Sequence, residues 1–225
     1  MDRLFAISDI HGCFNPFYEL VVNAIKLSKS DQLILLGDYI DRGEQSKEVI
    51  DFIIDLINKG YNVTALMGNH EAMLMDSYKN PDLLPLWFMN NGISTLESFG
   101  IQDIREIDRR YIEFFDSLKY YSIIGNVIFV HAGFDDFALN PFEDKHTMIW
   151  ECSASYQNPL LAGKTIIHGH RSKTISHVKK LISEKSKVIP IDTGCVYAKE
   201  IGYGNLSALE VNSMRLVSIS NKPGV

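Results

Sequence analysis

Five short polar clusters in this 225-residue chain contain side chains of the kinds that bind metal ions and phosphate. Carboxylate, imidazole and amide oxygen are good ligands for borderline divalent cations such as manganese, iron or zinc. If the clusters converge in space, they would form a centre for two metal ions. The clusters are Asp9-x-His11, Gly37-Asp38-x-x-Asp41-Arg42-Gly43, Gly68-Asn69-His70-Glu71, His131-Ala132-Gly133 and His168-Gly169-His170.

Each cluster directly follows an apolar segment that has the length of a buried strand. Near the start of the chain we expect strands at Leu4–Ser8, Gln32–Leu36 and Val63–Met67, each followed by a polar motif and then a helix. This alternation predicts an α/β fold with parallel strands. In such sheets, functional side chains gather beyond the carboxyl ends of the strands, which is where these motifs fall.

Helical spacing of apolar residues predicts helices over Phe14–Lys29 and Ser46–Lys59. Ser46 is expected to cap the second helix and Gly60 to end it. The segment Pro81–Lys119 is expected to be helical too, and its many aromatic side chains to pack in a core. Within that segment, the part around Trp87, Asn90 and Asn91 is the most open to a role in substrate binding.

Beyond Tyr120 the pattern changes to that of strands. A hairpin is predicted over Tyr121–Ile124 and Val127–Val130, and a later one turns at Asn212-Ser213. The sequence contains no internal repeat, low-complexity tract or linker, so we expect one domain over residues 1–225. Further strands are expected at Thr165–Ile167, Val188–Ile191, Leu206–Val211 and Leu216–Ile219.

The order of these motifs resembles the phosphoprotein phosphatase family of calcineurin-like metallophosphoesterases. The resemblance runs from Asp9 to about Gly194, and its motifs are long and ordered. It implies an α/β sandwich of two mixed β-sheets flanked by helices. The segment Asp192-Thr193-Gly194 is similar to small bacterial and phage-type members, including the symmetrical diadenosine tetraphosphate hydrolases.

The resemblance implies two divalent metal ions per chain, with manganese expected and iron or zinc as alternatives. Asp9 and His11 would hold the first ion, and Asp38 would bridge both. Such a pair lowers the pKa of a bridging water and so supplies a hydroxide that attacks phosphorus directly. Asp9 or Asp38 alone could equally cap a helix. By the same resemblance, the second ion would be held by Asn69, His131 and His170.

The same resemblance gives catalytic roles to three further residues. His70 would act as the general acid, and Asp41 would orient its ring. Arg42 has a planar guanidinium that can grip two phosphoryl oxygens, together with Asn69 as a substrate contact. A surface ion pair is the alternative for Arg42. Glu71 is expected to support the loop around it.

The sequence departs from the family pattern at Cys152, where small members place an arginine as a second phosphate clamp. Arg171, next to His170, is the candidate that could replace it. A choice also exists between His168 and His170 as the metal ligand. The order of residues in the family favours His170, which leaves His168 as a structural histidine with a local hydrogen bond.

We expect hydrolysis of phosphomonoesters, with phosphoserine or phosphothreonine in proteins as the substrate. The nearest alternative is symmetrical cleavage of a dinucleoside polyphosphate such as diadenosine tetraphosphate, which would require a pocket where a base can stack. A nuclease is a further possibility. An alternative of another class is a non-catalytic metal-binding scaffold, although the proposed ligands, Asp41 and His70 are all present.

Net charge, cysteine spacing and the length of apolar runs argue against several other classes of protein. A net charge of −6 argues against stable binding of nucleic acid, and Cys13, Cys152 and Cys195 form no Cys-x-x-Cys pair. None of the three is followed by the arginine of a Cys-x5-Arg loop, which excludes a thiolate-dependent phosphatase. Apolar runs are too short for a secretory signal or a membrane span, so a cytoplasmic protein is expected. The oligomeric state stays open.

Overall fold

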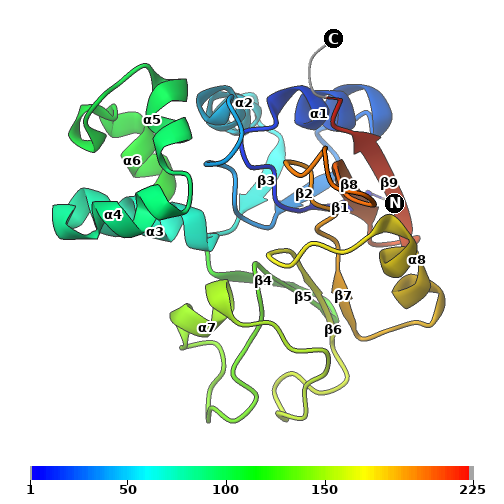
Figure 1. The fold of residues 1–225 in the computed structure, drawn as a ribbon. Helices are drawn as coiled ribbons and strands as arrows, with labels where there is room; N and C mark the ends of the chain where they lie inside the picture. The colour runs from blue at the N-terminus through cyan, green and yellow to red at the C-terminus, as the bar shows by residue number, and fades with distance from the viewer. Residues whose placement is uncertain (1, 223–225) are drawn as a thin grey trace.

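The computed structural model describes residues 2–222, which form two β-sheets that face each other, with helices outside them (Figure 1). In the first sheet, three strands from the start of the chain run parallel, and two strands from its end are added antiparallel. The predicted parallel strands are therefore confirmed. In spatial order this sheet contains β3 (Asn62–Ala65), β2 (Gln32–Leu35), β1 (Leu4–Ile7), β8 (Asn205–Glu210) and β9 (Arg215–Ser220).

The second sheet is also mixed. Its first two strands form the predicted antiparallel hairpin, and the remaining two are added in parallel. The order is β4 (Tyr121–Ile124), β5 (Val127–Val130), β6 (Thr165–His168) and β7 (Val188–Pro190). The expected α/β fold with two mixed sheets flanked by helices is confirmed.

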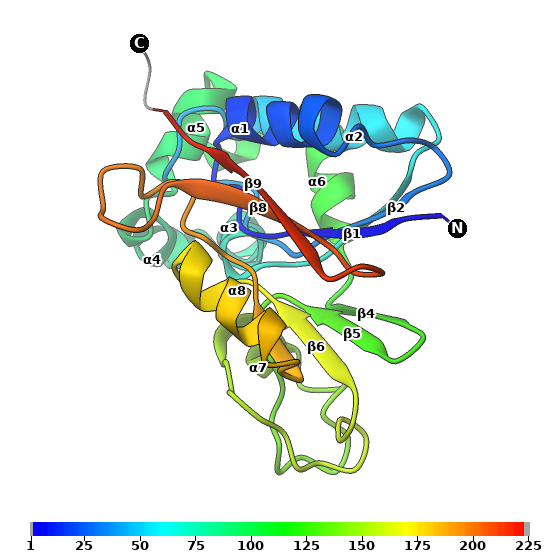
Figure 2. The same cartoon turned by 90° about the vertical axis from the view of Figure 1, so that its right-hand side faces the viewer.

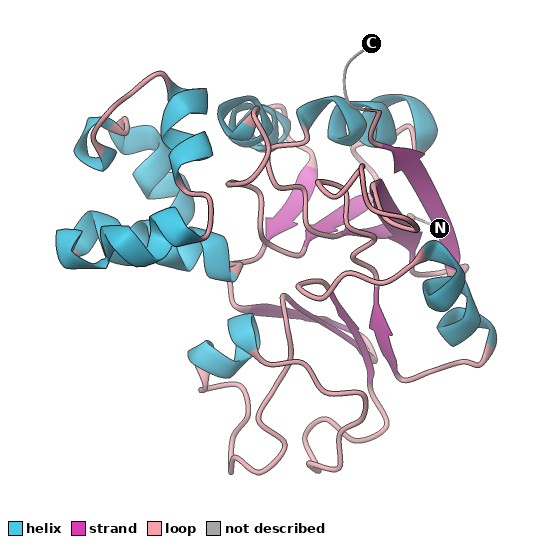
Figure 3. Ribbon diagram, in the orientation of Figure 1, coloured by secondary structure: helices cyan, strands magenta, loops and turns pink. Residues whose placement is uncertain are grey.

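Helices cover the outside of the two sheets. The helices α1 and α2 lie over the outer face of the first sheet, while α8 packs beside the second sheet (Figure 2). A group of helices from the middle of the chain projects to one side, and α7 lies below it (Figure 3). The α-helices are α1 (Phe14–Tyr18), α2 (Ser46–Asn58), α3 (Asn69–Lys79), α4 (Leu84–Met89), α5 (Ile93–Phe99), α6 (Arg109–Asp116), α7 (Lys145–Trp150) and α8 (Ile175–Ser183).

Strand β1 is apolar throughout because both of its faces are buried. Leu4 and Ala6 belong to the core between the sheets, together with side chains of the second sheet such as Phe129. Phe5 and Ile7 point the other way, into the core beneath the helices. Successive side chains of a strand alternate between its faces, so a strand buried on both sides has no polar positions.

Two details of the predicted helices are wrong. The helix expected over Phe14–Lys29 changes into a π-helical turn, Glu19–Ala24, where the backbone N–H of Ile25 donates to the carbonyl of Leu20, and the helix ends there. Ser46 is not the cap of α2 but its first residue. Its hydroxyl instead accepts a hydrogen bond from the backbone N–H of Asp41 at 3.1 Å.

The short helices α7 and α8 were not predicted. Each begins with a side-chain cap: Asp144 accepts from the backbone N–H of Thr147, and Thr174 accepts from that of His177. Such caps satisfy amide groups that have no partner inside a helix. None of the helices described is long and apolar enough to cross a membrane.

The core between the sheets provides a test of the fold. Phe129 is fully buried there, so Phe129→Ala should lower the free energy of unfolding by about 3–5 kcal/mol through lost burial and the cavity left behind. Denaturant unfolding at a fixed metal concentration would measure the loss. As a control, Ile123→Ala on the exposed edge strand β4 should cost far less. Equal losses for the two variants would contradict the packing described.

Candidate metal centre

The loops after five strands bring the predicted site residues together. The loops after β1 and β2 are tied to each other, because the backbone N–H groups of Ile10 and His11 both donate to the carbonyl of Asp38 at 2.9 Å. The loops after β5 and β6 are tied in the same way, with the N–H of Gly169 donating to the carbonyl of His131 at 2.8 Å. The carboxyl ends of strands from both sheets therefore meet at one place.

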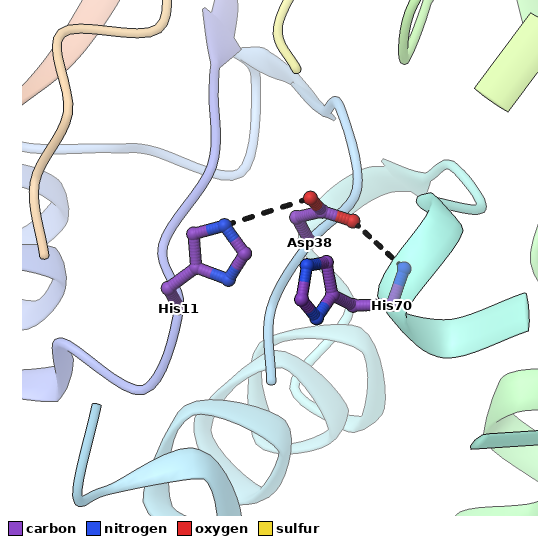
Figure 4. Close-up of side chains that lie close together, drawn as sticks. All are labelled: His11, Asp38 and His70. Carbon is purple, nitrogen blue, oxygen red and sulfur yellow. Dashed lines mark hydrogen bonds and ion pairs between the residues drawn. The ribbon is translucent and has the colours of Figure 1, made fainter. Parts of the chain in front are cut away.

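A first group of possible metal ligands consists of His11, Asp38 and His70 (Figure 4). One ligand atom from each lies within 4.8 Å of the others, and Nε2 of His11 is 3.5 Å from a carboxylate oxygen of Asp38. The other ring nitrogen of His11, Nδ1, donates to the carbonyl of Ile40 at 2.9 Å. That bond leaves the lone pair of Nε2 facing the carboxylate, which is the orientation that a metal ligand needs.

A second group consists of Asp38, His131 and His170. Nε2 of His131 is 3.2 Å from Nδ1 of His170, and the side-chain oxygen of Asn69 lies 3.0 Å and 3.1 Å from these two nitrogens. Nδ1 of His131 donates to the carbonyl of Leu36 at 2.9 Å, so its Nε2 has a free lone pair. Possible ligand atoms from three side chains therefore converge at one place, where a cation could bind.

Asp38 belongs to both groups, which is the position expected of a bridging ligand. Asp9 belongs to neither; its carboxylate accepts from the hydroxyl of Ser8 at 2.7 Å and from the backbone N–H of His170 at 3.1 Å. Asp9 therefore lies beside the second group, because it accepts a hydrogen bond from the backbone N–H of His170, which belongs to that group. His168 is buried, and its Nδ1 lies 3.0 Å from the carbonyl oxygen of Gly169, a local contact.

Charge and burial at these residues fit bound cations. Burial raises the pKa of Asp9 and, aided by the negative charges of Asp9 and Glu71, raises the pKa of Asp38 well above its usual value. Burial also lowers the pKa of His131 and of His170 to about 3, so both rings are neutral and able to bind a metal. Buried carboxylates of this kind need positive charge beside them, and divalent cations supply it.

The backbone at the site is strained in the way that functional sites often are. Residues other than glycine rarely adopt positive φ angles, and each such residue costs about 1–3 kcal/mol. Several of the predicted site residues do so. They are His11 (47°), Asp38 (53°), Asp41 (68°), Arg42 (69°) and His170 (66°).

His70 and Asp41 form a buried pair. Nδ1 of His70 donates to Asp41 at 2.7 Å, while Nε2 has no hydrogen-bond partner among residues 2–222. Burial raises the pKa of Asp41 to about 7 and lowers that of His70 to about 3. The same carboxylate accepts from the indole N–H of Trp87 at 2.8 Å and from the hydroxyl of Thr95 at 2.5 Å. Trp87 and Thr95 therefore hold the carboxylate that orients the His70 ring.

Sequence reasoning missed the contribution of Trp87 and Thr95. They lie 46 and 54 residues beyond Asp41, and no short motif connects them to it. Trp87 was expected in the core, with a substrate role as the alternative; it lies in the core, as expected, and also bonds to Asp41. Gly92 supplies the room for its ring, because a Cβ there would collide with the indole. The signal available in the sequence was weak: a tryptophan with a glycine five residues after it.

Glu71 supports the loop after β2, as expected. Its buried carboxylate accepts from the backbone N–H groups of Asp38 at 2.9 Å, Tyr39 at 2.7 Å and Gly68 at 3.1 Å. Only glycine fits at position 68, since a Cβ would collide with Asp38. Hydrogen bonds to an ionised group are stronger than neutral ones, so Glu71 holds Asp38 firmly at the centre.

Positive side chains lie beside both groups. Nη1 of Arg42 lies 2.6 Å from Nε2 of His11, and the Arg42 guanidinium lies 5.8 Å from the centre of the Tyr197 ring. Arg171 and Lys173 line an open cleft of about 810 Å³ whose wall also includes His170. This cleft, which also includes His146, Trp150 and Tyr197, is called the basic cleft below.

Cys152, which stands where the family has a second arginine, is neutral. Burial raises the pKa of the Cys152 thiol to about 11, and the positive charge of the nearby Arg171 opposes that rise. The thiol lies 3.7 Å from Nδ1 of His168. Cys152 therefore offers no charge to a phosphate, and Arg171 is the cation next to it.

A family model described as calcineurin-like phosphoesterase matches residues 3–194 of the chain. The asymmetrical bis(5'-nucleosyl)-tetraphosphatase PrpE of Bacillus velezensis is 26% identical over 219 residues, which cover 87% of this chain and 85% of that protein. Serine/threonine-protein phosphatase 2 of Salmonella typhimurium is 32% identical over 90 residues, 40% of this chain and 38% of that protein. A solved structure of a candidate diadenosine tetraphosphatase has the same fold, with a TM-score of 0.69 and 21% identity over 99% of this chain and 95% of that one.

The shared position of Asp38 can be tested directly. Loss of a group that merely supports a metal ligand lowers metal affinity 10- to 100-fold. Asp38→Asn removes a ligand itself, so it should lower the affinity for both cations by more than about a hundredfold. Metal content after dialysis against Mn²⁺, measured by mass spectrometry, should fall from about two ions per chain to less than one. Asp55→Asn on the exposed face of α2 is the matched control. Two ions retained by Asp38→Asn would refute a bridging role.

The carboxyl groups also predict how cation binding depends on pH. Because their pKa values lie above the ordinary value of about 3.9, Asp9 and Asp38 retain protons in the metal-free protein that a cation displaces. His131 and His170 are already neutral and release none. Affinity for Mn²⁺ should therefore rise, with release of protons, as the pH increases through the raised pKa values of these two carboxyl groups. Titration calorimetry in buffers of different ionisation enthalpy would measure this; uptake of protons would contradict it.

Proposed function

Since the chain belongs to the calcineurin-like phosphoesterase family, we propose that it hydrolyses dinucleoside polyphosphates with two divalent cations, cleaving diadenosine tetraphosphate asymmetrically. The relative from Bacillus velezensis, which matches most of the chain, supports a dinucleotide substrate and this mode of cleavage. The protein phosphatase expected from the motifs is the second candidate. It is supported less well, because similarity to the Salmonella enzyme extends over only part of the chain.

The observation that carries the proposal is the number of cations beside the candidate metal centre. Arg171 and Lys173 line the basic cleft next to His170, and Arg42 lies near Tyr197, which lines the same cleft. A phosphorylated serine brings one phosphate group to such a site. A tetraphosphate chain brings four linked groups, so its charge matches several cations in addition to the metals.

The metal ligands that we propose are Asp9, His11, Asp38, Asn69, His131 and His170; His70 belongs to the first group but is proposed for proton transfer. Their carboxylate, imidazole and amide donors fit manganese, iron or zinc equally. When bound, two such cations would neutralise charge on the phosphate oxygens and lower the pKa of a water molecule. The buried, paired carboxylates and converging imidazole nitrogens are the features of this chain that support that assignment.

His70 is the residue that we propose as the proton donor to the leaving group. Hydrolysis joins a water oxygen to phosphorus and breaks the bond from phosphorus to the leaving phosphate oxygen, which then takes a proton. The unpartnered Nε2 of His70 is the atom from which that proton would come, and Asp41 holds the ring through Nδ1. Burial disfavours the charged ring, but a bound anionic phosphate beside Nε2 opposes that effect.

The complete set of groups argues against a non-catalytic scaffold. A scaffold that only bound metals would have no need of the pair formed by His70 and Asp41, or of the donors that Trp87 and Thr95 contribute to it. The unpartnered buried nitrogen of His70 is costly in a purely structural site. These features favour an enzyme.

Steady-state turnover tests the proposal. Metal-stripped protein reloaded with Mn²⁺ should show a kcat/KM for diadenosine tetraphosphate at least about tenfold above that for a phosphothreonine peptide. The products should be ATP and AMP in equal amounts, resolved by chromatography. His70→Asn, assayed in parallel, shows whether turnover belongs to this site. A preference for the peptide would replace the proposal with the protein phosphatase, and ADP as sole product would show symmetrical cleavage.

A further inference from the structure

A second cleft, of about 660 Å³, is lined by residues of α3 and α4 on one side and of α7 on the other. Figure 1 shows where these three helices lie. We call this second cleft the helical cleft. Its size falls within the range of pockets that bind small molecules, about 300–1,000 Å³. It shares His146 and Trp150 with the basic cleft, so the two clefts adjoin. The residues used below are Ser77, Lys79, Trp87, Asp116, His146 and Trp150.

The walls of the helical cleft contact the candidate metal centre at two places. The ring of Trp150 packs edge to face against the ring of His170, with centroids 6.3 Å apart. On the opposite wall, Trp87 donates its hydrogen bond to Asp41. The helical cleft therefore lies next to the candidate metal centre.

His146 and Trp150, which line both clefts, have flat aromatic rings. The His146 ring stacks on the indole of Trp150 at an interplanar angle of 26°, with centroids 6.2 Å apart. His146 is exposed, and Trp150 is half-buried, so both have surface available for contact. Flat aromatic faces bind nucleobases by stacking, and every base has a face suited to it.

A buried polar atom also points to a ligand with hydrogen-bonding groups. Ser77, on α3, lines the cleft with 1% of its surface exposed, and its hydroxyl has no hydrogen-bond partner among the described residues. A buried hydroxyl without a partner is unfavourable in the free protein. Lys79 and Asp116 lie 3.9 Å apart and add charged groups to the lining.

We propose that the helical cleft binds the nucleoside next to the phosphate that is cleaved, with the base stacked at Trp150 and His146 and a polar atom of the nucleoside bonded to Ser77. The proposal rests on the proposed function, which supplies the dinucleotide. An apolar side chain of a peptide is the competing occupant. It would leave the buried hydroxyl of Ser77 unsatisfied, whereas a nucleoside combines a flat face with a polar edge.

Intrinsic fluorescence reports directly on this cleft. The chain has two tryptophans, Trp87 and Trp150, and both line the helical cleft. Adenosine added to the Mn²⁺-loaded protein should quench their emission in a saturable way, while ribose should not. An unchanged emission with adenosine would overturn the proposal, as would saturable quenching by a phosphothreonine peptide that adenosine fails to displace.

Ser77→Ala tests the polar contact. Removal of one hydrogen bond should raise the Kd for adenosine about fivefold and lower kcat/KM for the dinucleotide by a similar factor relative to p-nitrophenyl phosphate. The melting temperature should stay the same or rise, because an unpartnered buried hydroxyl is removed. Ser183→Ala, at an exposed helical serine, is the matched control. An unchanged Kd in Ser77→Ala would contradict the contact.

The two proposals fail in different ways. If the protein hydrolyses the dinucleotide but adenosine causes no quenching and Ser77→Ala loses no selectivity, the nucleoside site is wrong and the proposed function stands. If adenosine binds and Ser77→Ala weakens it, but the dinucleotide is not hydrolysed, the nucleoside site stands and the proposed function is wrong.

Discussion

The arrangement around the candidate centre depends on one buried carboxylate, that of Asp38, held between two sets of imidazole nitrogens. A charge removed from water costs several kcal/mol unless opposite charge accompanies it. The fold meets that cost by bringing ligand groups from both sheets to the same point, so that cations can bind there. The two sheets therefore have to meet at the carboxyl ends of their strands, and the polar loops have to lie inward.

The position of each ligand is set by the backbone more than by neighbouring side chains. The carbonyls of Ile40 and Leu36 fix which nitrogen of His11 and His131 has a free lone pair. Glu71 in turn holds the backbone of the loop that carries Asp38. Hydrogen bonds of this kind leave a ligand little freedom to reorient, so the geometry exists before any cation arrives.

The elements that could be predicted are those whose signal is local. The parallel strands appear as apolar runs followed by motifs, and the hairpin of β4 and β5 appears as two apolar segments around Gly125-Asn126. Helix α7 has six residues, too few for its periodicity to stand out. The π-helical turn after α1 and the bonds from Trp87 and Thr95 to Asp41 depend on tertiary packing, which no spacing of residues reveals.

Trp87 belongs to two environments, since its indole nitrogen supports Asp41 while its ring forms a wall of the helical cleft. Because Trp87 has both roles, few substitutions at this position would preserve them both. Helix α4 cannot be remodelled to accept a new ligand without disturbing the partner of His70. Helix α7 is freer, because it contacts the centre through the packing of the Trp150 ring on His170 and through a backbone hydrogen bond from Ala132 to Met148, which most side-chain changes would preserve. Diversification among descendants of this chain should therefore accumulate in α7 and the loop before it, while α4 changes slowly.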